Sequence, residues 1–203
     1  MEVMRVVVTG PVGAGKSTFI RNISEITAVN TDCRATDETA RLKQDTTVAM
    51  DFGRLQFNPQ MVLHLYGTPG QSRFNFMWDM LIRKAHAYIV LVPSHQPMEF
   101  RQAKVIMNFM QQRTKAPMII GLTHGDCQGA WSSENVVHSL GYYHSQILPT
   151  VIPVNANNKQ SVAKAVLTLV RMLAQQMRAR EISQAQHFKK KETFNDPADK
   201  MAM

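Results

Sequence analysis

The sequence predicts an α/β fold of three layers, in which a mainly parallel sheet with one antiparallel edge hairpin lies between helices. Short apolar or β-branched runs alternate with segments of helical periodicity along most of the chain, which is typical of parallel sheets with crossover helices. Polar or glycine-rich motifs follow several of the expected strands directly, and such sheets bind ligands at the carboxyl ends of their strands. We therefore expect the functional residues to meet at one edge of the sheet.

The first expected strand, 4–9, leads through a glycine-rich loop into an amphipathic helix over 17–26. The loop fits the phosphate-loop pattern and reads Gly10, Pro11, Val12, Gly13, Ala14, Gly15, Lys16, Ser17, with Thr18 next. Its glycines let successive N–H groups turn toward a phosphate, and Lys16 adds a full positive charge. Ser17 offers a hydroxyl to Mg²⁺, and the start of the helix favours an anion. We expect this loop to hold a triphosphate; the alternative is an ordinary glycine-rich turn.

The middle of the chain predicts a long loop followed by a hairpin. Residues 27–46 are polar with little apolar periodicity, and a loop of that length inside a compact domain is usually functional. Strands are expected over 45–53 and 61–66, joined by a short link that suits a hairpin.

The remaining elements continue the alternation. We expect strands over 86–92, 117–122 and 150–154, and helices over 98–113, 134–140 and 161–180. The apolar pattern fades from about Ser183, so we divide the chain into a globular domain, 1–182, and a flexible basic tail, 183–203.

The bulk composition bounds the class of protein. A chain of 203 residues that is 44% hydrophobic suits one core. We find no apolar run long enough to cross a membrane and no signal peptide at the start, so we expect a cytoplasmic protein. Cys33 and Cys127 lack metal-site spacing and are expected to be reduced.

The net charge of +8 raises the question of a nucleic-acid or membrane partner. Because the charges are dispersed and not interleaved with aromatic residues, we favour a solvated surface and no nucleic-acid partner. Lys189 to Lys191 lie between Phe188 and Phe194, which leaves weak peripheral contact with an anionic membrane as an alternative to a solvated tail.

The order of the motifs resembles that of the Ras-like small GTPases. The carriers of the resemblance are the phosphate loop, the polar stretch that ends in threonine before a strand, and the run from Gly67 to Phe74, GTPGQSRF. The form GTPGQ is similar to bacterial members of the MglA-like group. The resemblance covers about residues 3–177. It implies a P-loop NTPase fold of the Ras-like G-domain type that binds GTP and GDP with Mg²⁺ and hydrolyses GTP.

The resemblance also implies roles for individual residues. Thr47 matches the threonine that joins Ser17 on Mg²⁺, although Thr46 competes for that role. Gly70 matches the glycine whose N–H meets the γ-phosphate, and Gln71 matches the glutamine that orients the attacking water. We therefore expect Gln71, Thr47 and Lys16 to serve hydrolysis; the alternative for Gln71 is a solvated side chain at the start of a helix.

Two later loops resemble the base-binding motifs of the same family. Thr123, His124 and Asp126 stand where the family reads guanine, and Asn155, Ala156 and Asn157 stand in its last base-contacting loop. A carboxylate at 126 matches the paired N–H donors of guanine, which adenine lacks, so we expect GTP over ATP. The alternative for Asp126 is an ordinary loop carboxylate. His124 replaces a lysine, and from this change we expect lower nucleotide affinity.

Several residues depart from the family pattern. Gly67 replaces an aspartate that supports Mg²⁺, so we expect weaker coupling of Mg²⁺ to nucleotide binding; Asp51 could substitute through water or serve the structure. Val12 crowds the γ-phosphate position, so we expect slow intrinsic hydrolysis that depends on an activator. Arg41 is a candidate for an arginine supplied by the chain itself.

The apolar segment 74–82 is the expected partner surface. Phe74, Phe76 and Trp78 belong to it, and together these residues exceed what one buried stripe can hide; the alternative is that nearly all of them are core. The resemblance implies a Roadblock-type regulatory protein as the partner. Two other functions remain open: a pseudoGTPase that binds nucleotide without appreciable hydrolysis, and a small-molecule kinase, which leaves Gln71 and Asp126 without a role.

Overall fold

The structure is a computed structural model that describes residues 1–27, 29–33, 48–143 and 148–194. Within these residues one seven-stranded sheet has the order β2-β3-β4-β1-β5-β6-β7. The strands are β1 (Glu2–Thr9), β2 (Val29–Cys33), β3 (Val48–Asn58), β4 (Met61–Gly67), β5 (Ala87–Pro93), β6 (Met118–Thr123) and β7 (Thr150–Pro153). Strand β3 is antiparallel to both β2 and β4, and the other pairs are parallel.

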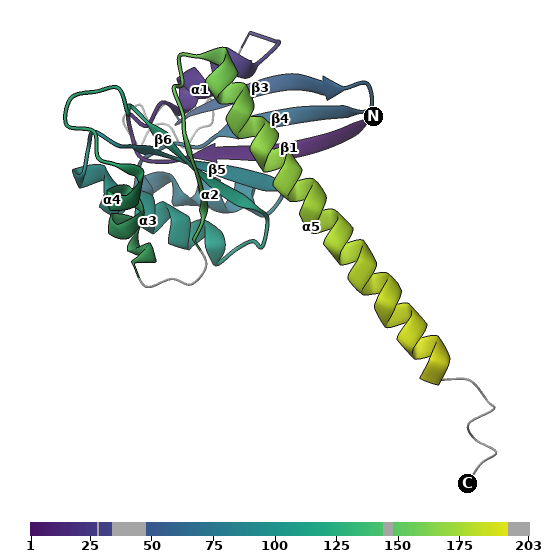
Figure 1. The fold of residues 1–203 in the computed structure, drawn as a ribbon. Coiled ribbons are helices and arrows are strands. Elements are labelled where there is room, and N and C mark those ends of the chain that lie inside the picture. Colours follow the sequence, from purple (N-terminus) through teal and green to yellow (C-terminus); the bar gives the residue numbers. More distant parts are fainter. Residues whose placement is uncertain (28, 34–47, 144–147, 195–203) are drawn as a thin grey trace, which may run out of the picture.

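Helices cover both faces of the sheet, which confirms the three-layer α/β prediction (Figure 1). One core lies beneath α1 (Lys16–Ile23) and α5 (Lys159–Phe194). The second core lies beneath α2 (Asn75–Ile82), α3 (Met98–Gln111) and α4 (Ser133–Val137). A 3₁₀ turn, η2 (Ser72–Phe74), precedes α2, and a π-helical turn, η3 (His138–Tyr142), follows α4. Strand β5 is buried along its whole length because both cores press on it.

Strand β2 corrects the prediction that residues 27–46 form a loop. It pairs antiparallel with β3 from Val29 opposite Phe52 to Cys33 opposite Val48. Its sequence, VNTDC, lacks the apolar alternation of a half-buried strand. The backbone hydrogen bonds of β3 therefore define this strand, and such pairing leaves no local signal in the sequence. Residues 34–47, including Arg41, Thr46 and Thr47, lie outside the described residues.

Helix α5 is longer than the periodicity predicts. It begins at Lys159 and continues past Arg180 to Phe194, and its second half projects away from the sheet (Figure 1). The last side chain of α5 in the core is Leu173. Backbone helix thus extends into the segment that we expected to be a flexible tail, while the division at residue 182 remains a prediction.

The parallel strands bring their carboxyl ends to one edge. Strands β1, β4, β5, β6 and β7 all run in the same direction. The carboxyl ends of β1, β4 and β6 and the segments that follow them carry the predicted phosphate loop, Gly70 with Gln71, and the residues from Thr123 to Asp126. The loop after β7 carries residues 155–157 to the same edge. Among the described helices, none is both long and apolar enough to span a bilayer.

Candidate nucleotide-binding site

The phosphate loop joins β1 to α1 and needs glycine at two places. A Cβ on Gly10 would lie 2.2 Å from the carbonyl oxygen of Leu91, so the loop passes against β5 without room for a side chain. Gly15 has a φ of 87° immediately before α1, in the left-handed region that favours glycine. Gly10 lets the loop lie close to the sheet, and Gly15 lets the chain turn from the loop into α1.

Lys16 is held over this loop. Its Nζ donates hydrogen bonds to the carbonyl oxygens of Gly10, at 2.9 Å, and Pro11, at 2.6 Å. Burial lowers the pKa of Lys16 from 10.5 to about 8, against the opposing pull of Asp51 and Glu99. An ammonium group that has lost its water gains most from a partner of opposite charge, and a phosphate supplies one.

Of the two predicted metal ligands, Ser17 and Thr47, the structure describes Ser17, which lies beside Asp51 and close to Gly67. The Ser17 hydroxyl donates a 2.5 Å hydrogen bond to Oδ2 of Asp51, which is only 8% exposed. A Cβ on Gly67 would lie 3.0 Å from Cβ of Asp51 and 3.1 Å from Oδ2 of Asp51. The Asp51 carboxylate therefore reaches Ser17 from β3 and occupies the space that a side chain at 67 would need.

This geometry removes the premise of one expectation. We expected weaker coupling of Mg²⁺ to nucleotide binding because position 67 lacks an acid. In the structure, Asp51 on the neighbouring strand β3 places a carboxylate there. A hydroxyl and a carboxylate are oxygen donors of the kind that Mg²⁺ prefers. The residues present therefore fit that ion.

The loop after β4 lies directly on the phosphate loop. A Cβ on Gly70 would approach the Val12 nitrogen to 2.6 Å and the Pro11 carbonyl carbon to 2.7 Å, so only glycine fits. Gln71 is exposed, and Val12 is 54% exposed. Both side chains line a groove of about 640 Å³ between this loop and the start of α3, together with Gly70, Ser72, Met98, Glu99, Arg101, Gln102 and Val105.

Helix α2 corrects part of the expected partner surface. Trp78 is 1% exposed, and its Nε1–H donates a 2.7 Å hydrogen bond to the carbonyl of Pro69. Phe74 is also buried, whereas Phe76 and Met80 are more than half exposed. Trp78 is buried because its ring belongs to the second core while its polar edge ties α2 to the loop above. Of the three predicted aromatic residues, Phe76 alone is open to a partner.

The expected base-binding loops meet the phosphate loop. The Thr123 hydroxyl is buried and directs its single proton toward the Ala14 carbonyl, at 3.1 Å, with the Val92 carbonyl at 3.4 Å as a second acceptor. A Cβ on Gly15 would lie 3.4 Å from Cβ of Ala156 and 3.9 Å from Cε1 of His124. Residues separated by more than 100 positions are thus gathered around one short loop, as the order of the motifs predicts.

Asp126 and the last loop complete this arrangement. Asp126 is exposed at the end of the β6 loop, and its charge acts on the neighbouring His124 ring. Beyond β7, the side-chain amide of Asn22 in α1 donates a 2.6 Å hydrogen bond to the Ala156 carbonyl. The Asn155 side chain accepts from the Asn157 N–H at 2.9 Å, which shapes the loop internally.

His95 is a site residue that the sequence reasoning missed. Its ring lies 4.6 Å from that of His124, centroid to centroid, and its buried Nδ1 has no hydrogen-bond partner among the described residues. Burial, and then the neighbouring His95, lower the pKa of His124. The His124 ring therefore stays neutral to a lower pH than an ordinary histidine does. The position of His95, two residues after the buried strand β5, is a signal that could have identified it.

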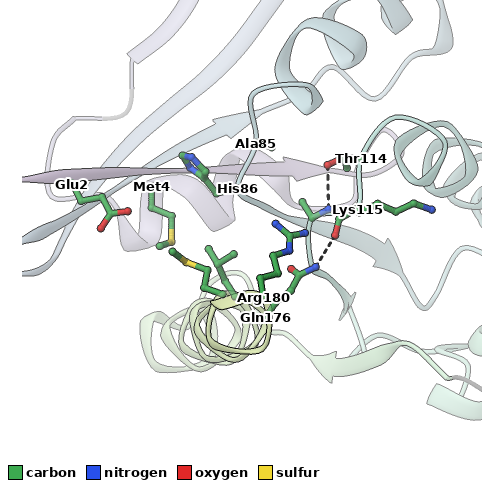
Figure 2. A pocket seen from close by; sticks show the side chains of 11 residues that line it. Glu2, Met4, Ala85, His86, Thr114, Lys115, Gln176 and Arg180 are labelled. Atoms are coloured by element: carbon green, nitrogen blue, oxygen red, sulfur yellow. Dashed lines mark hydrogen bonds between the residues drawn. The ribbon is translucent and has the colours of Figure 1, made fainter. Parts of the chain in front are cut away.

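A separate pocket of about 290 Å³ lies at the opposite, amino-terminal edge of the strands (Figure 2). Helix α5 forms one wall with Gln176 and Arg180, and His86 and Met4 lie across from it (Figure 2). The pocket shares no residue with the phosphate loop or the base-binding loops.

Three comparisons relate the chain to known proteins. The model of a family described as "conserved hypothetical ATP binding protein" matches residues 27–193. An uncharacterized protein of Methanocaldococcus jannaschii is 25% identical over 104 residues, which span 51% of this chain and 59% of that protein. The solved structure of the Arl6 BBS3 small GTPase from Trypanosoma brucei, with a bound nucleotide analogue, GppNp, matches with a TM-score of 0.66 at 16% identity. That match covers 86% of this chain and 99% of the other, and at this identity it shows the small-GTPase fold alone.

Proposed function

Because the chain belongs to the family described as conserved hypothetical ATP-binding proteins, we propose that it is a nucleotide-dependent molecular switch that binds GTP and hydrolyses it slowly. The family match begins at residue 27, after the phosphate loop. The phosphate loop, with its buried Lys16, is therefore support for nucleotide binding that is independent of the family match.

The observation that carries the proposal is the hydrogen bond from the Thr123 hydroxyl to the Ala14 carbonyl. It fixes the loop that bears Asp126 to the loop that bears Lys16, so one nucleotide can meet both. The Asp126 carboxylate has two acceptor oxygens, which can take the adjacent N–H donors that guanine presents and adenine does not. This chemistry favours GTP, although the family is described as ATP-binding, so ATP is the second candidate nucleotide.

The chain's own residues divide the proposed work. Lys16 and the loop N–H groups hold the phosphates, and Ser17, with Asp51 behind it, would hold Mg²⁺ together with Thr47. When bound, the ion neutralises charge on the phosphate oxygens. Gln71 would orient the attacking water. Loss of the Gly70 contact with the γ-phosphate and of the Thr47 contact with Mg²⁺ after hydrolysis would free two segments, which is how such a switch signals.

Slow hydrolysis follows from the groove around Gln71. The exposed Val12 side chain shares this groove with Gln71, and a branched side chain there obstructs a water or an activating group. A partner that orders Gln71 would accelerate the reaction. If hydrolysis stays negligible with any partner, the chain is a pseudoGTPase, a binding module that responds to nucleotide alone.

Partner binding is proposed at the same end of the molecule. Phe76 and Met80 on α2 offer exposed apolar side chains next to the Gly70 loop, and a Roadblock-type regulatory protein is the first partner to test. We place this activity in the cytoplasm, with any membrane contact weak and peripheral.

The test is nucleotide affinity of the full chain, measured with fluorescent GTP and ATP analogues, combined with multiple-turnover phosphate release. We expect GTP to bind more tightly than ATP. Asp126→Asn should lower GTP affinity by about 100-fold and leave ATP affinity nearly unchanged, since it removes charge-assisted bonds to guanine alone. Glu134→Gln, which removes an exposed acid from the first turn of α4, is the control. Equal loss of both nucleotides in Asp126→Asn, or preference for ATP, would refute the assignment.

A further inference from the structure

One face of the sheet at β3 and β4 has no helix of the described chain packed on it. On these strands Leu55, Leu63 and Leu65 point into the core beneath α1 and α5. The opposite core, beneath α2 and α3, contains side chains of β1, β5, β6 and β7 but none of β3 or β4. Of the side chains of β3 and β4 that alternate with these leucines, Phe52, Arg54, His64 and Tyr66 are half-buried on that face, whereas Val62 is fully buried.

Strand register arranges these side chains in two rows. Arg5 of β1, His64 of β4 and Arg54 of β3 lie directly opposite one another across three strands. In the next row, Tyr66 lies opposite Phe52. The Phe52 ring is 5.3 Å from both the His64 ring and the Tyr66 ring, centroid to centroid. A cationic row thus borders an aromatic row on one face.

The cationic row has only neutral partners within the described chain. Arg5 donates to the carbonyl of Lys84 at 2.8 Å, and Arg54 donates to the side-chain oxygen of Gln56 at 3.4 Å. The ion pairs found among the described residues both involve Asp79, which pairs with Arg83 and Arg113 and not with this row. Burial, and then Arg54 and Arg5, lower the pKa of His64. The His64 ring is therefore uncharged at pH 7, and the row holds two guanidinium charges on either side of it, with no carboxylate paired to either among the described residues.

We propose that the face formed by Arg5, His64 and Arg54 with Phe52 and Tyr66 binds an acidic segment of a partner protein. Carboxylates complement the two guanidinium groups, and Arg, Tyr and Phe are enriched in the buried centres of protein interfaces. A second copy of this chain is a poor occupant because both copies carry a net charge of +8. The Phe52 and His64 rings meet edge to face, at 83°, and support each other instead of presenting parallel faces to stacked bases. The surface lies on the sheet face opposite Asp51, so the proposal does not depend on nucleotide hydrolysis.

The test uses the full chain and a fluorescent peptide in which Glu alternates with Trp, followed by anisotropy at low and physiological salt. The double variant Arg5→Gln, Arg54→Gln should weaken peptide binding by about tenfold, as expected for the loss of two partly desolvated charge contacts. The matched control is Arg171→Gln, Arg178→Gln, which removes the same charge from exposed positions of α5. We expect this control to change the affinity less than about twofold.

Two further measurements separate the occupants and guard against misfolding. A single-stranded RNA oligonucleotide and vesicles with anionic headgroups are titrated in parallel, and tighter binding of either one through Arg5 and Arg54 would overturn the proposal. Equal losses in the test and control variants would also overturn it, because net charge alone would then explain binding. Thermal unfolding of Arg54→Gln should show a melting temperature close to that of the wild type, since the side-chain hydrogen bond that it removes is a 3.4 Å contact with Gln56.

Discussion

Asp51 on β3 and Gly67 on β4 together place one carboxylate beside Ser17. The carboxylate at 51 hydrogen-bonds Ser17, and the absence of a side chain at 67 makes room for it. The two positions are therefore coupled, and an acid at one is compatible with glycine at the other. This coupling can be tested by moving the acid.

We expect Gly67→Asp alone to lower the free energy of unfolding by about 2–3 kcal/mol, because it overpacks the site and adds a second carboxylate. Its Cβ would lie 2.9 Å from Cδ1 of Ile20 and 3.0 Å from Cβ of Asp51. The exchange Asp51→Ala with Gly67→Asp should recover part of that loss. Urea denaturation measures stability, and Mg²⁺ titration of nucleotide release measures the site. Unchanged Mg²⁺ dependence in Asp51→Ala alone would contradict a role for this carboxylate.

Lys16 gives a second prediction at the residue scale. Its pKa is about 8 in the folded protein against an ordinary value of 10.5, so keeping it charged at pH 7 costs about 3 kcal/mol. The unfolded chain binds more protons than the folded one between these two pKa values, so stability rises with pH across that window. Lys16→Met should raise the free energy of unfolding by about 1–3 kcal/mol at pH 7, with the gain disappearing toward pH 10.

The same substitution should abolish nucleotide binding, which separates function from stability at one residue. The measurements are urea denaturation at pH 7 and pH 10 and nucleotide titration at pH 7. Lys164→Met, at an exposed position of α5, is the control for loss of a lysine charge. A less stable Lys16→Met protein at pH 7 would show that the hydrogen bonds to Gly10 and Pro11 outweigh the cost of burial.

At the scale of elements, α2 and α5 show opposite relations to the core. Helix α2 is held by the core and by the loop that precedes the helix. Trp78 packs in the second core, and its Nε1–H donates a hydrogen bond to the Pro69 carbonyl of that loop. This hydrogen bond joins the loop to the helix that carries the exposed Phe76. Helix α5 packs on the first core up to Leu173 and then continues without buried side chains to the end of its described side chains at Ser183.

We predict that truncation after Ser183 changes the free energy of unfolding by less than about 0.5 kcal/mol, because the removed segment follows the last core contact. Leu173→Ala, by contrast, should cost about 2–4 kcal/mol through the cavity that it leaves. Urea denaturation of both variants makes the comparison. A large loss on truncation would show that residues after 183 belong to the folded domain and not to a tail.

At the scale of the molecule, the site assembles from separate loops at one edge of the sheet. A ligand that holds them together stabilises only the folded state. We expect GTP with Mg²⁺, at about 100 times its dissociation constant, to add about 2.7 kcal/mol and to raise the melting temperature by about 5–10 °C. Thermal scans with GTP, ATP and neither provide the measurement. An equal shift by ATP would favour the second candidate nucleotide, and the absence of any shift would contradict nucleotide binding.

Several features could be predicted from the sequence because their signals are local. The phosphate loop is a continuous motif between a strand and a helix, and the alternation of apolar runs fixes the three layers. Thr123 and Ala156 lie against the phosphate loop, as predicted, because the loops that follow parallel strands lie at one edge of the sheet. Local pattern and strand direction together are sufficient for these predictions.

Other features were decided by tertiary structure, because they depend on which residues face each other across strands. Strand β2 exists through its pairing with β3, and Asp51 reaches Ser17 only because β3 lies antiparallel beside β4. The row of Arg5, His64 and Arg54 joins positions far apart in the chain through register alone. The sequence by itself determined the motifs and most of the strands and helices that carry them. Register and strand order come from hydrogen bonds and packing between distant segments, so only the tertiary structure revealed these neighbours.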